Sequence, residues 1–580
     1  MSTSEQGASR RTRTLNRIHA RMASMSRGAT AFTTTPEPKT IGTIPRGRQL
    51  IAGNFLFAGY LVEAPDRSIW DLPIPDEIFE AELHGFTWLD DLAALGDLTA
   101  IERAQDWTHG WIERYGKGRG PGWTPDLTGR RLIRWINHAI LLLNGRSSDT
   151  SRAFFRSLAS QTTFLGRRWS TSPPGLARFE ALTGLIYAGL SLQGMDRYVG
   201  SAMRALATEC ASQINDEGGI PTRNPEELLE VFTLLNWSAA ALTDAGRMPG
   251  GAHLDAIEKI APALRALRHA DGGLARFHGG GRGLEGRVDR ALSLSGNRDI
   301  VKDARAMGFA RMSHGRTTLI VDAARPPKPV ASANAHASTL AFELTSGRRP
   351  IIVNCGSGAT FGESWRRAGR ATPSHSTLGI EGYSSSRLGA AGMIRGRKAE
   401  LLVDAPREVR FERQPVEGGE RVAVGHDGYV ATHGLTHVRT LQMAFNGRSL
   451  AGEDVLAALD RGAERRFDLS FDRSKMQGIP YAIRFHLYPE VEAVVDMGGT
   501  AVSLSLRSGE TWVFRAGRGA RLSLDPSVYL EKSRLSPRAT KQIVLSGHAM
   551  QYTTRIGWSL SKTEGTPSFV RDYELEEIDA

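Results

Sequence analysis

Residues 331–382 read ASANAHASTLAFELTSGRRPIIVNCGSGATFGESWRRAGRATPSHSTLGIEG, and they indicate the fold class of the C-terminal half. Two short apolar runs, 340–344 and 351–353, each end in Gly- and Ser-containing turns, which is typical of successive strands in an antiparallel sheet. His336 and His375 lie in the same stretch among small amides and hydroxyls. Rigid strands can hold such polar groups in place, so this stretch is the first candidate for a functional site.

Working outward from this stretch, the period of the apolar residues divides the chain into two large parts. Between residues 46 and 307 apolar side chains recur at helical spacing, and after residue 308 short extended segments follow one another. A chain of 580 residues also exceeds the size that a single hydrophobic core supports. We therefore expect an α-helical domain at 46–307 and an antiparallel β-sandwich at 308–565.

The two ends of the chain differ from these parts in composition. Residues 1–45 are rich in Ser, Thr, Arg and Gly, and we expect a basic, disordered tail there. The alternative is that the basic segment 10–22 coils into a short amphipathic helix, of the kind that lies on anionic membranes or enters a partner's groove. Residues 566–580 are expected to form an acidic C-terminal tail.

The charge of the chain bears on its partners. Lys and Arg number 73 against 62 Asp and Glu, a net charge of +11, which favours polyanionic ligands or serves only solubility. Because no nucleic-acid-binding motif accompanies the charge, we expect an acidic polysaccharide or oligosaccharide and no nucleic acid. Cys210 and Cys355 lie in different domains, which argues against a disulfide framework.

Targeting signals are the next question. No apolar run approaches the ~18 residues of a membrane span, and the N-terminus lacks the apolar core of a secretory signal. The expected location is therefore the cytoplasm, with the periplasm as the alternative. The sequence does not indicate an oligomeric state.

Five segments in order carry a resemblance to a known family: NAHASTLAFEL (334–344), IIVNCGSG (351–358), SHSTLGIEG (374–382), HDGYVATHGLTHVRTL (426–441) and RFHLYP (484–489). Together with the preceding helical half, they resemble the heparinase II/III family of polysaccharide lyases. The resemblance implies an incomplete (α/α) toroid followed by a β-sandwich of antiparallel sheets. It also implies cleavage of a uronate-containing glycan by β-elimination.

β-Elimination needs three functions: donors that neutralise the uronate carboxylate, a base for the C5 proton and an acid for the departing O4. By the resemblance, Asn224 occupies the carboxylate-neutralising position. Asn224 before Pro225 is also an ordinary helix N-cap, and the two roles are compatible. His278 stands where the family has its catalytic Tyr, and a histidine can exchange protons near neutral pH.

The family's His-x-His-x-Asp pattern is altered in this chain. Asn334 stands at the position of the catalytic His, His336 is retained, and Ser338 replaces the acidic residue. Some members of the family hold a structural metal, and the corresponding positions here are His336, Asn354 and His375. Zn²⁺ seldom takes an amide oxygen, so these three residues either hold a structural Zn²⁺ or form a hydrogen-bonded cluster.

The remaining candidates are substrate-binding side chains. Guanidinium groups pair with carboxylates and sulfates through two parallel hydrogen bonds, and a phenol from the β half would replace the missing tyrosine. The candidates are Arg223, Arg276, Arg366, Arg367, Arg370 and Tyr429.

Two functions remain open at this point. The first is a polysaccharide lyase that uses Asn224, His278, and Asn334 or His336. The second is a non-catalytic protein that binds or handles an acidic glycan on the same fold, which the replacement of both the Tyr and the His favours. No pair of acidic residues indicates a hydrolase.

Overall fold

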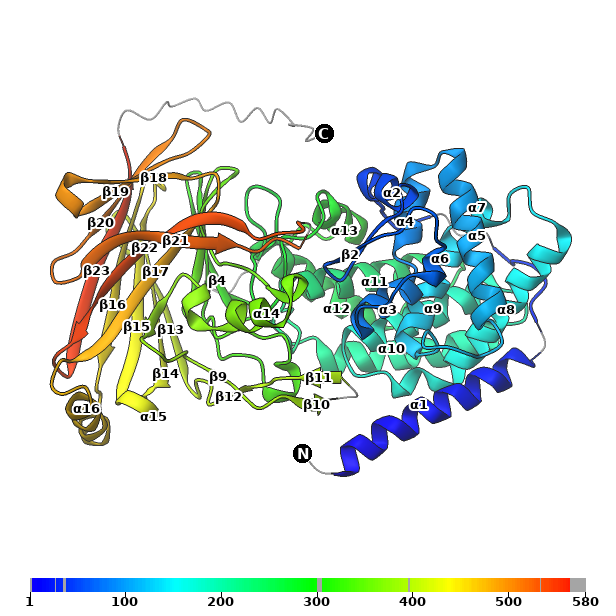
Figure 1. The fold of residues 1–580 in the computed structure, drawn as a ribbon, viewed down its shortest axis with the longest axis horizontal. Coiled ribbons are helices and arrows are strands. Elements are labelled where there is room, and N and C mark those ends of the chain that lie inside the picture. Colours follow the sequence, from blue (N-terminus) through cyan, green and yellow to red (C-terminus); the bar gives the residue numbers. More distant parts are fainter. Residues whose placement is uncertain are drawn as a thin grey trace.

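The computed structural model describes residues 3–26, 28–34, 38–299, 305–394, 397–532 and 534–563. A helical half and a β half lie side by side along the longest axis of the molecule (Figure 1). The expected acidic tail at 566–580 lies outside the described residues. Among the helices that are described, none is both long and apolar enough to cross a bilayer.

The helical half is an incomplete (α/α) toroid, as the sequence predicts. A two-stranded hairpin, β1 (Asn54–Phe57) and β2 (Tyr60–Glu63), follows its first helix. The helices are α2 (Ile44–Ile51), α3 (Glu77–Gly85), α4 (Trp88–Leu95), α5 (Leu98–Tyr115), α6 (Pro125–Asn137), α7 (Ala139–Leu143), α8 (Ser148–Arg168), α9 (Leu176–Ser191), α10 (Val199–Gln213), α11 (Pro225–Asp244), α12 (Gly251–Ala266) and α13 (Arg287–Ser295).

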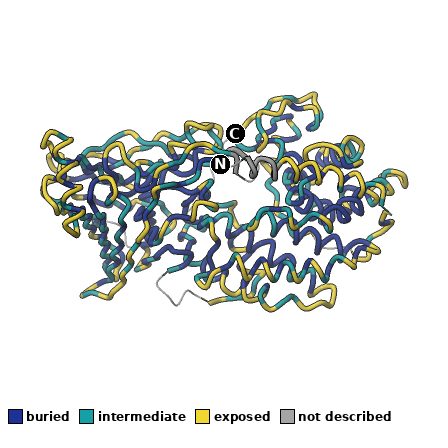
Figure 2. The backbone as a smooth tube through the Cα atoms, turned by 90° about the horizontal axis from the view of Figure 1, so that it is seen from below, coloured by how far each residue is buried: buried dark blue, intermediate teal, exposed yellow. Residues whose placement is uncertain are grey.

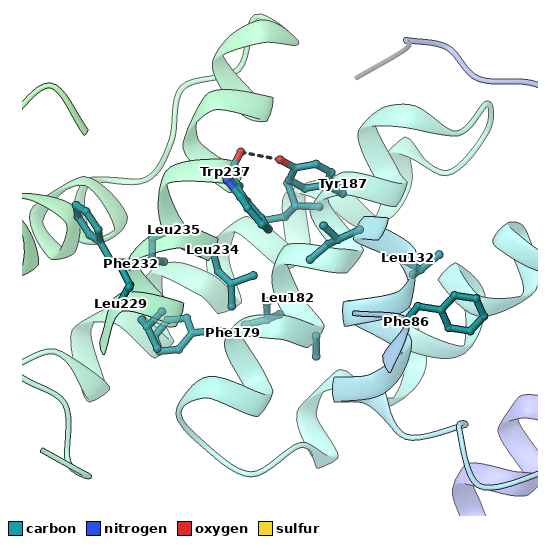
Figure 3. Packing of buried hydrophobic residues seen from close by; sticks show 14 of the residues in the cluster. Phe86, Leu132, Phe179, Leu182, Tyr187, Leu229, Phe232, Leu234, Leu235 and Trp237 are labelled. Carbon is teal, nitrogen blue, oxygen red and sulfur yellow. Dashed lines mark hydrogen bonds between the residues drawn. The ribbon is translucent and has the colours of Figure 1, made fainter. Parts of the chain in front are cut away.

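Helix α9 lies at the centre of this half and is buried on nearly every side. Its side chains, among them Phe179 and Leu182, pack in one apolar cluster with Phe232 of α11 (Figure 3). A Cβ atom added to Gly184 of α9 would lie 2.4 Å from the Cα atom of Gly129 on α6. Only glycine therefore permits the close approach of these two helices.

The β half is a sandwich of two antiparallel sheets, which confirms the predicted fold class. Short helices accompany it: α14 (Glu363–Arg370), α15 (Val430–His433) and α16 (Arg461–Arg473). Two small strand pairs do so as well: β9 (Arg387–Leu388) with β12 (Leu402–Val403), and β10 (Gly392–Ile394) with β11 (Arg397–Ala399). The first sheet has the order β13 (Val409–Val416), β14 (Gly419–Tyr429), β15 (Leu435–Ala444), β16 (Ser449–Ala457), β23 (Thr553–Lys562), β20 (Thr511–Ala516), β19 (Ala501–Ser505) and β18 (Glu492–Asp496).

The second sheet carries the stretch that opened the sequence analysis. Its order is β21 (Arg521–Tyr529), β22 (Arg538–Ala549), β17 (Ile479–Leu487), β7 (Arg349–Val353), β6 (Phe342–Ser346), β5 (Thr317–Asp322), β4 (Phe309–His314) and β3 (Arg305–Ala306), with β8 (Leu378–Ile380) also paired to β17. Aromatic rings fill the space between the sheets: Phe342 stacks on Trp558, with centroids 5.9 Å apart.

The N-terminal region differs from the expected disordered tail. Residues Thr3–Ser24 form helix α1, which packs along α8. Asn16, Ala20 and Ala23 are buried against the body, and Arg168 Nε of α8 donates to Asn16 Oδ1 at 2.8 Å. These small residues recur on one helical face and let α1 approach α8 closely, a pattern that composition alone does not reveal.

Two contacts join the helical half and the β half away from the point where the chain passes from one to the other. A Cβ atom added to Gly59, at the tip of the β1–β2 hairpin, would lie 2.1 Å from the carbonyl oxygen of Thr360 in the β half. Lys532, in the loop between β21 and β22, places its Nζ 2.5 Å from Glu226 Oε2 on α11. The toroid and the sandwich are thus tied together by loops from each.

Candidate functional site

The candidate site lies where three segments meet: the start of α11, the loop after α12 and the loop between β5 and β6. The loop after α12 contains the Gly279–Gly281 turn, which lies between the start of α11 and the loop between β5 and β6. An added Cβ on Gly279 would lie 3.0 Å from the carbonyl oxygen of Asn334, and one on Gly280 would lie 2.5 Å from Asn224 Oδ1. The structure therefore brings Asn224 and Asn334 to opposite sides of one glycine turn.

Asn224 acts as the N-cap of α11. Its Oδ1 accepts hydrogen bonds from the backbone N–H groups of Glu226 and Glu227, at 3.0 and 3.2 Å. Within the described part of the chain, the Asn224 amide nitrogen makes no hydrogen bond. The capping role is thus present, and the N–H groups are left for a ligand.

Asn334 is exposed on the other side of the turn. Arg366 of α14 donates to the backbone oxygen of Ala333 at 3.0 Å and approaches Asn334 Oδ1 at 3.5 Å. A carboxamide does not exchange protons near neutral pH. At this position the chain therefore keeps a polar, hydrogen-bonding side chain and lacks an acid–base group.

His336 and His375 form an oriented pair. His375 Nδ1 lies 2.8 Å from the backbone oxygen of Ala371 and therefore carries the proton. His375 Nε2 then accepts from His336 Nδ1 at 3.0 Å, which leaves the Nε2 lone pair of His336 without a partner among the described residues. Burial lowers the pKa of His336 well below its ordinary value and that of His375 to about 4, so both rings are neutral.

His278 is sealed in the junction between the halves, with a fully buried side chain and a backbone φ of +48°. Its Nδ1 accepts from the backbone N–H of His336 at 3.2 Å, and its Nε2 lies 3.6 Å from Asp322 Oδ2. Burial and then the nearby Arg223 lower its pKa far below the ordinary value. The ring is neutral and has no free lone pair, and its expected role in proton transfer stays a prediction.

Arg223 is buried in the same junction, and its expected role in substrate binding stays a prediction. Its Nη2 pairs with Asp322 Oδ1 at 2.6 Å, and Ser338 Oγ donates to Asp322 Oδ2 at 2.8 Å. Arg223 also donates to four backbone carbonyls, those of Met307, Gly308, Ala324 and Arg325. Its guanidinium therefore links the toroid to the start of the sandwich.

Arg276 and Arg370 likewise make their contacts inside the protein, and their expected role in substrate binding stays a prediction. The Arg276 guanidinium lies 3.9 Å from the ring centroid of Tyr529 and donates to the backbone oxygen of Asn354. Arg370 is buried and donates to the carbonyls of Ser332, Ala335 and Glu400, at 2.9, 2.8 and 2.9 Å. It braces the loop that carries Asn334 and His336.

Tyr429 also lies away from the surface, and its expected role in substrate binding stays a prediction. It is fully buried in the sandwich core, and its hydroxyl donates to the backbone oxygen of Leu378 at 3.2 Å. A β-bulge between His426 and Tyr429 interrupts the alternation of the strand. The bulge explains why both of these side chains point inward.

The expected metal ligands do not fit a zinc site. Asn354 is committed on both sides, since its Oδ1 accepts from the backbone N–H of Ser376 at 3.0 Å and its Nδ2 donates to Glu343 at 3.3 Å. A metal would also have to displace the hydrogen bond between His336 and His375. In the described ranges, no three or more His, Cys, Asp or Glu side chains are grouped so as to hold a metal ion. The geometry is that of a hydrogen-bonded cluster.

Of the expected arginines, Arg366 lies near the turn and Arg367 is exposed on the same helix; one further lysine, Lys532, also lies near the turn. The side chain of Arg366 is 19 % exposed, and that of Arg367 is 55 % exposed and pairs with Glu400. Lys532 is the residue that sequence analysis missed. Its partner Glu226 Oε2 also accepts from the backbone N–H of Gly281, at 2.8 Å, so Lys532 lies beside the glycine turn.

Comparison with known proteins places these observations in a family context. Residues 297–559 match the family model "Heparinase II/III-like, C-terminal". "FtsZ-localized protein C" of Caulobacter vibrioides is 27% identical over 525 residues, which cover 90% of this chain and 88% of that protein.

Solved lyase structures share the whole fold. A crystal structure of heparinase III matches with a TM-score of 0.69 at 13% identity, over 94% of this chain and 89% of that one. The heparan sulfate lyase HepC of Pedobacter heparinus matches with a TM-score of 0.58 at 14% identity, over 97% and 90% of the two chains. At this level of identity the likeness establishes the fold.

Proposed function

By residues 297–559 this chain belongs to the heparinase II/III-like family of polysaccharide lyases, and from that premise we propose that it binds an acidic polysaccharide or oligosaccharide beside the Gly279–Gly281 turn without cleaving it. The ligand would meet the amide groups of Asn224 and Asn334 and the cations of Arg366 and Lys532. A uronate carboxylate or a sulfate suits these donors.

One observation supports this proposal: neither Asn334 nor His278 offers a free proton acceptor in this structure. Elimination requires removal of a weakly acidic C5 proton and protonation of O4. Asn334 has no group that titrates near neutral pH. His278 has a fully buried side chain whose Nδ1 lone pair accepts from the backbone N–H of His336.

The test separates binding from cleavage. Purified full-length protein is mixed with heparan, hyaluronate, alginate or polyglucuronate. Binding is followed by calorimetry, and the unsaturated uronate product by its ultraviolet absorbance. The proposal expects heat of binding with at least one polymer and no rise in absorbance. Asn224→Ala and Lys532→Ala should each weaken the binding, whereas Arg410→Ala, at an exposed site on β13, should not.

A second candidate function is β-elimination with His336 as the base, and the hydrogen bonds of the His336 ring favour it. The relay through His375 to the Ala371 carbonyl fixes the His336 tautomer and leaves the Nε2 lone pair free. In that case Nε2 takes the C5 proton, the C4–C5 double bond forms as the C4–O4 bond breaks, and the same proton is returned to O4. Absorbance that rises with wild type, persists in His278→Ala and vanishes in His336→Gln would establish this reaction.

The relative in Caulobacter suggests where such a protein acts. That relative is named for localisation with FtsZ, and it aligns with this chain over most of both lengths. We extend the proposal to an association of this chain with FtsZ. Co-sedimentation of the purified protein with polymerised FtsZ from the same organism tests it, with unpolymerised FtsZ as the control. The expected cytoplasmic location is tested by fractionation of the source cells.

A further inference from the structure

Helix α1 has three distinct faces, each visible in the spacing of its residues. Asn16, Ala20 and Ala23 form the face that is buried against the body. A second strip contains only arginines: Arg10, Arg13, Arg17 and Arg21, all exposed. A third strip contains Leu15, Ile18, Met22 and, just after the helix, Met25, which are 44, 48, 47 and 79 % exposed. Spacings of three and four residues keep each strip on one side of the helix.

The apolar strip and the arginine strip both face away from the protein. Helix α1 lies along the lower edge of the helical half in Figure 1 (dark blue), and Figure 2 shows exposed residues along the outer edges of both halves. Within the described ranges, no carboxylate forms an ion pair with any arginine of the second strip. Four large apolar side chains thus lie uncovered next to four arginines, none of which is ion-paired with an acid in the part of the chain that the structure describes.

Further positive charge lies next to the helix. The loop after α5 packs against α1, since a Cβ atom added to Gly118 would lie 2.5 Å from the backbone nitrogen of Arg21. Lys117 and Arg119 on either side of that glycine are exposed. The cationic surface therefore extends from α1 onto the toroid.

We propose that α1 lies on an anionic lipid surface, with the Leu15, Ile18, Met22 and Met25 strip in the boundary between headgroups and acyl chains and the arginines on the headgroups. A helix with one apolar strip beside a basic strip is the arrangement that interfacial helices use. Charge complementarity favours phospholipid phosphates over a neutral surface. The small-residue face holds α1 on α8, so lipid contact would orient the whole toroid edge toward the bilayer.

The experiment is co-sedimentation of the full chain with vesicles of phosphatidylcholine alone or mixed with phosphatidylglycerol. Wild type should sediment with the mixed vesicles only. The double variant Ile18→Glu, Met22→Glu should lose binding. Arg17→Ser with Arg21→Ser should weaken it about fivefold for each arginine removed. Leu469→Glu with Met476→Glu is the matched control, since these side chains on and just after α16 are 60 and 67 % exposed, and it should bind as wild type does.

Three results would overturn the proposal. The first is wild type that stays in solution with phosphatidylglycerol vesicles. The second is binding that is equal on neutral vesicles and indifferent to the arginine substitutions. The third is self-association, seen by light scattering without lipid and abolished by the Ile18 and Met22 substitutions, which would assign the apolar strip to a second copy of the chain. Unchanged circular dichroism in each variant establishes that loss of binding is not loss of fold.

Discussion

The substitution Arg223→Met tests whether one buried ion pair holds the two halves of the protein together. Arg223 belongs to the toroid, and its partner Asp322 ends strand β5 of the sandwich, with a side chain that is 0 % exposed. Methionine fills much of the space without the charge. The Asp322 carboxylate would then remain buried with only the Ser338 hydroxyl as a side-chain donor.

The expected loss follows from that geometry. Removing one partner of a buried pair lowers the free energy of unfolding by about 3–5 kcal/mol, because the other charge is left uncompensated. The four backbone carbonyls that Arg223 serves also lose a charged donor. The double variant Arg223→Met, Asp322→Asn should be more stable than Arg223→Met alone, since it carries no unpaired charge.

Urea unfolding followed by tryptophan fluorescence measures the effect, since most of the tryptophans lie in the helical half. Arg410→Met is the control: Arg410 pairs with Glu408 where both side chains are mostly exposed, and its loss should leave the unfolding curve unchanged. A loss below about 1 kcal/mol for Arg223→Met would refute the assignment of this pair as the main link. So would a double variant that is less stable than the single one.

Two further predictions concern the glycine turn and the response to pH. Gly280→Ala should lower the free energy of unfolding and weaken glycan binding, because the added Cβ would lie 2.5 Å from Asn224 Oδ1 and displace a helix cap that contributes about 1 kcal/mol. Gly251→Ala is the control and should be neutral, since an added Cβ there meets nothing within 4 Å. Equal effects of the two substitutions would disprove the steric argument. Burial depresses the pKa of His375 to about 4 and of His84 and His486 to about 3, so below pH ~6.5 the unfolded chain takes up protons that the folded chain does not. The free energy of unfolding should therefore fall as the pH is lowered from 6.5 towards 4, and urea titrations at intervals over that range would contradict this if stability stayed constant or rose.

The fold was accessible from the sequence because it is encoded in local period. The apolar run 351–353, for example, lies in strand β7. The sequence also indicates that Asp322 needs a partner, since a carboxylate at the end of a largely apolar strand must be paired if it is buried. A helix at 10–22 was the alternative to the expected tail, because composition does not show that Asn16, Ala20 and Ala23 find a surface on α8.

The roles of individual side chains were less accessible, because contacts between distant segments decide them. In the sequence Arg223 looks like an unpaired arginine in a turn. In the structure it pairs with Asp322, 99 positions further along the chain. Lys532 meets Glu226 across 306 positions, and no local pattern marks either residue. The inward direction of the Tyr429 side chain follows from a β-bulge that shifts the alternation of its strand. Residue types alone do not reveal that bulge.

These contacts support the proposal that the lyase fold persists here without lyase chemistry. In the junction, the carboxylate that the family pattern would place at position 338 is supplied by Asp322, and Ser338 donates to it. The ring at position 278 accepts from the backbone of the opposite half instead of facing a substrate. The Asp322 carboxylate and the Nδ1 atom of His278 are thus engaged by other groups of the protein. Contacts of this kind stabilise the joint between the halves. Under the proposed function, Asn224, Asn334 and the nearby cations are left to hold a ligand.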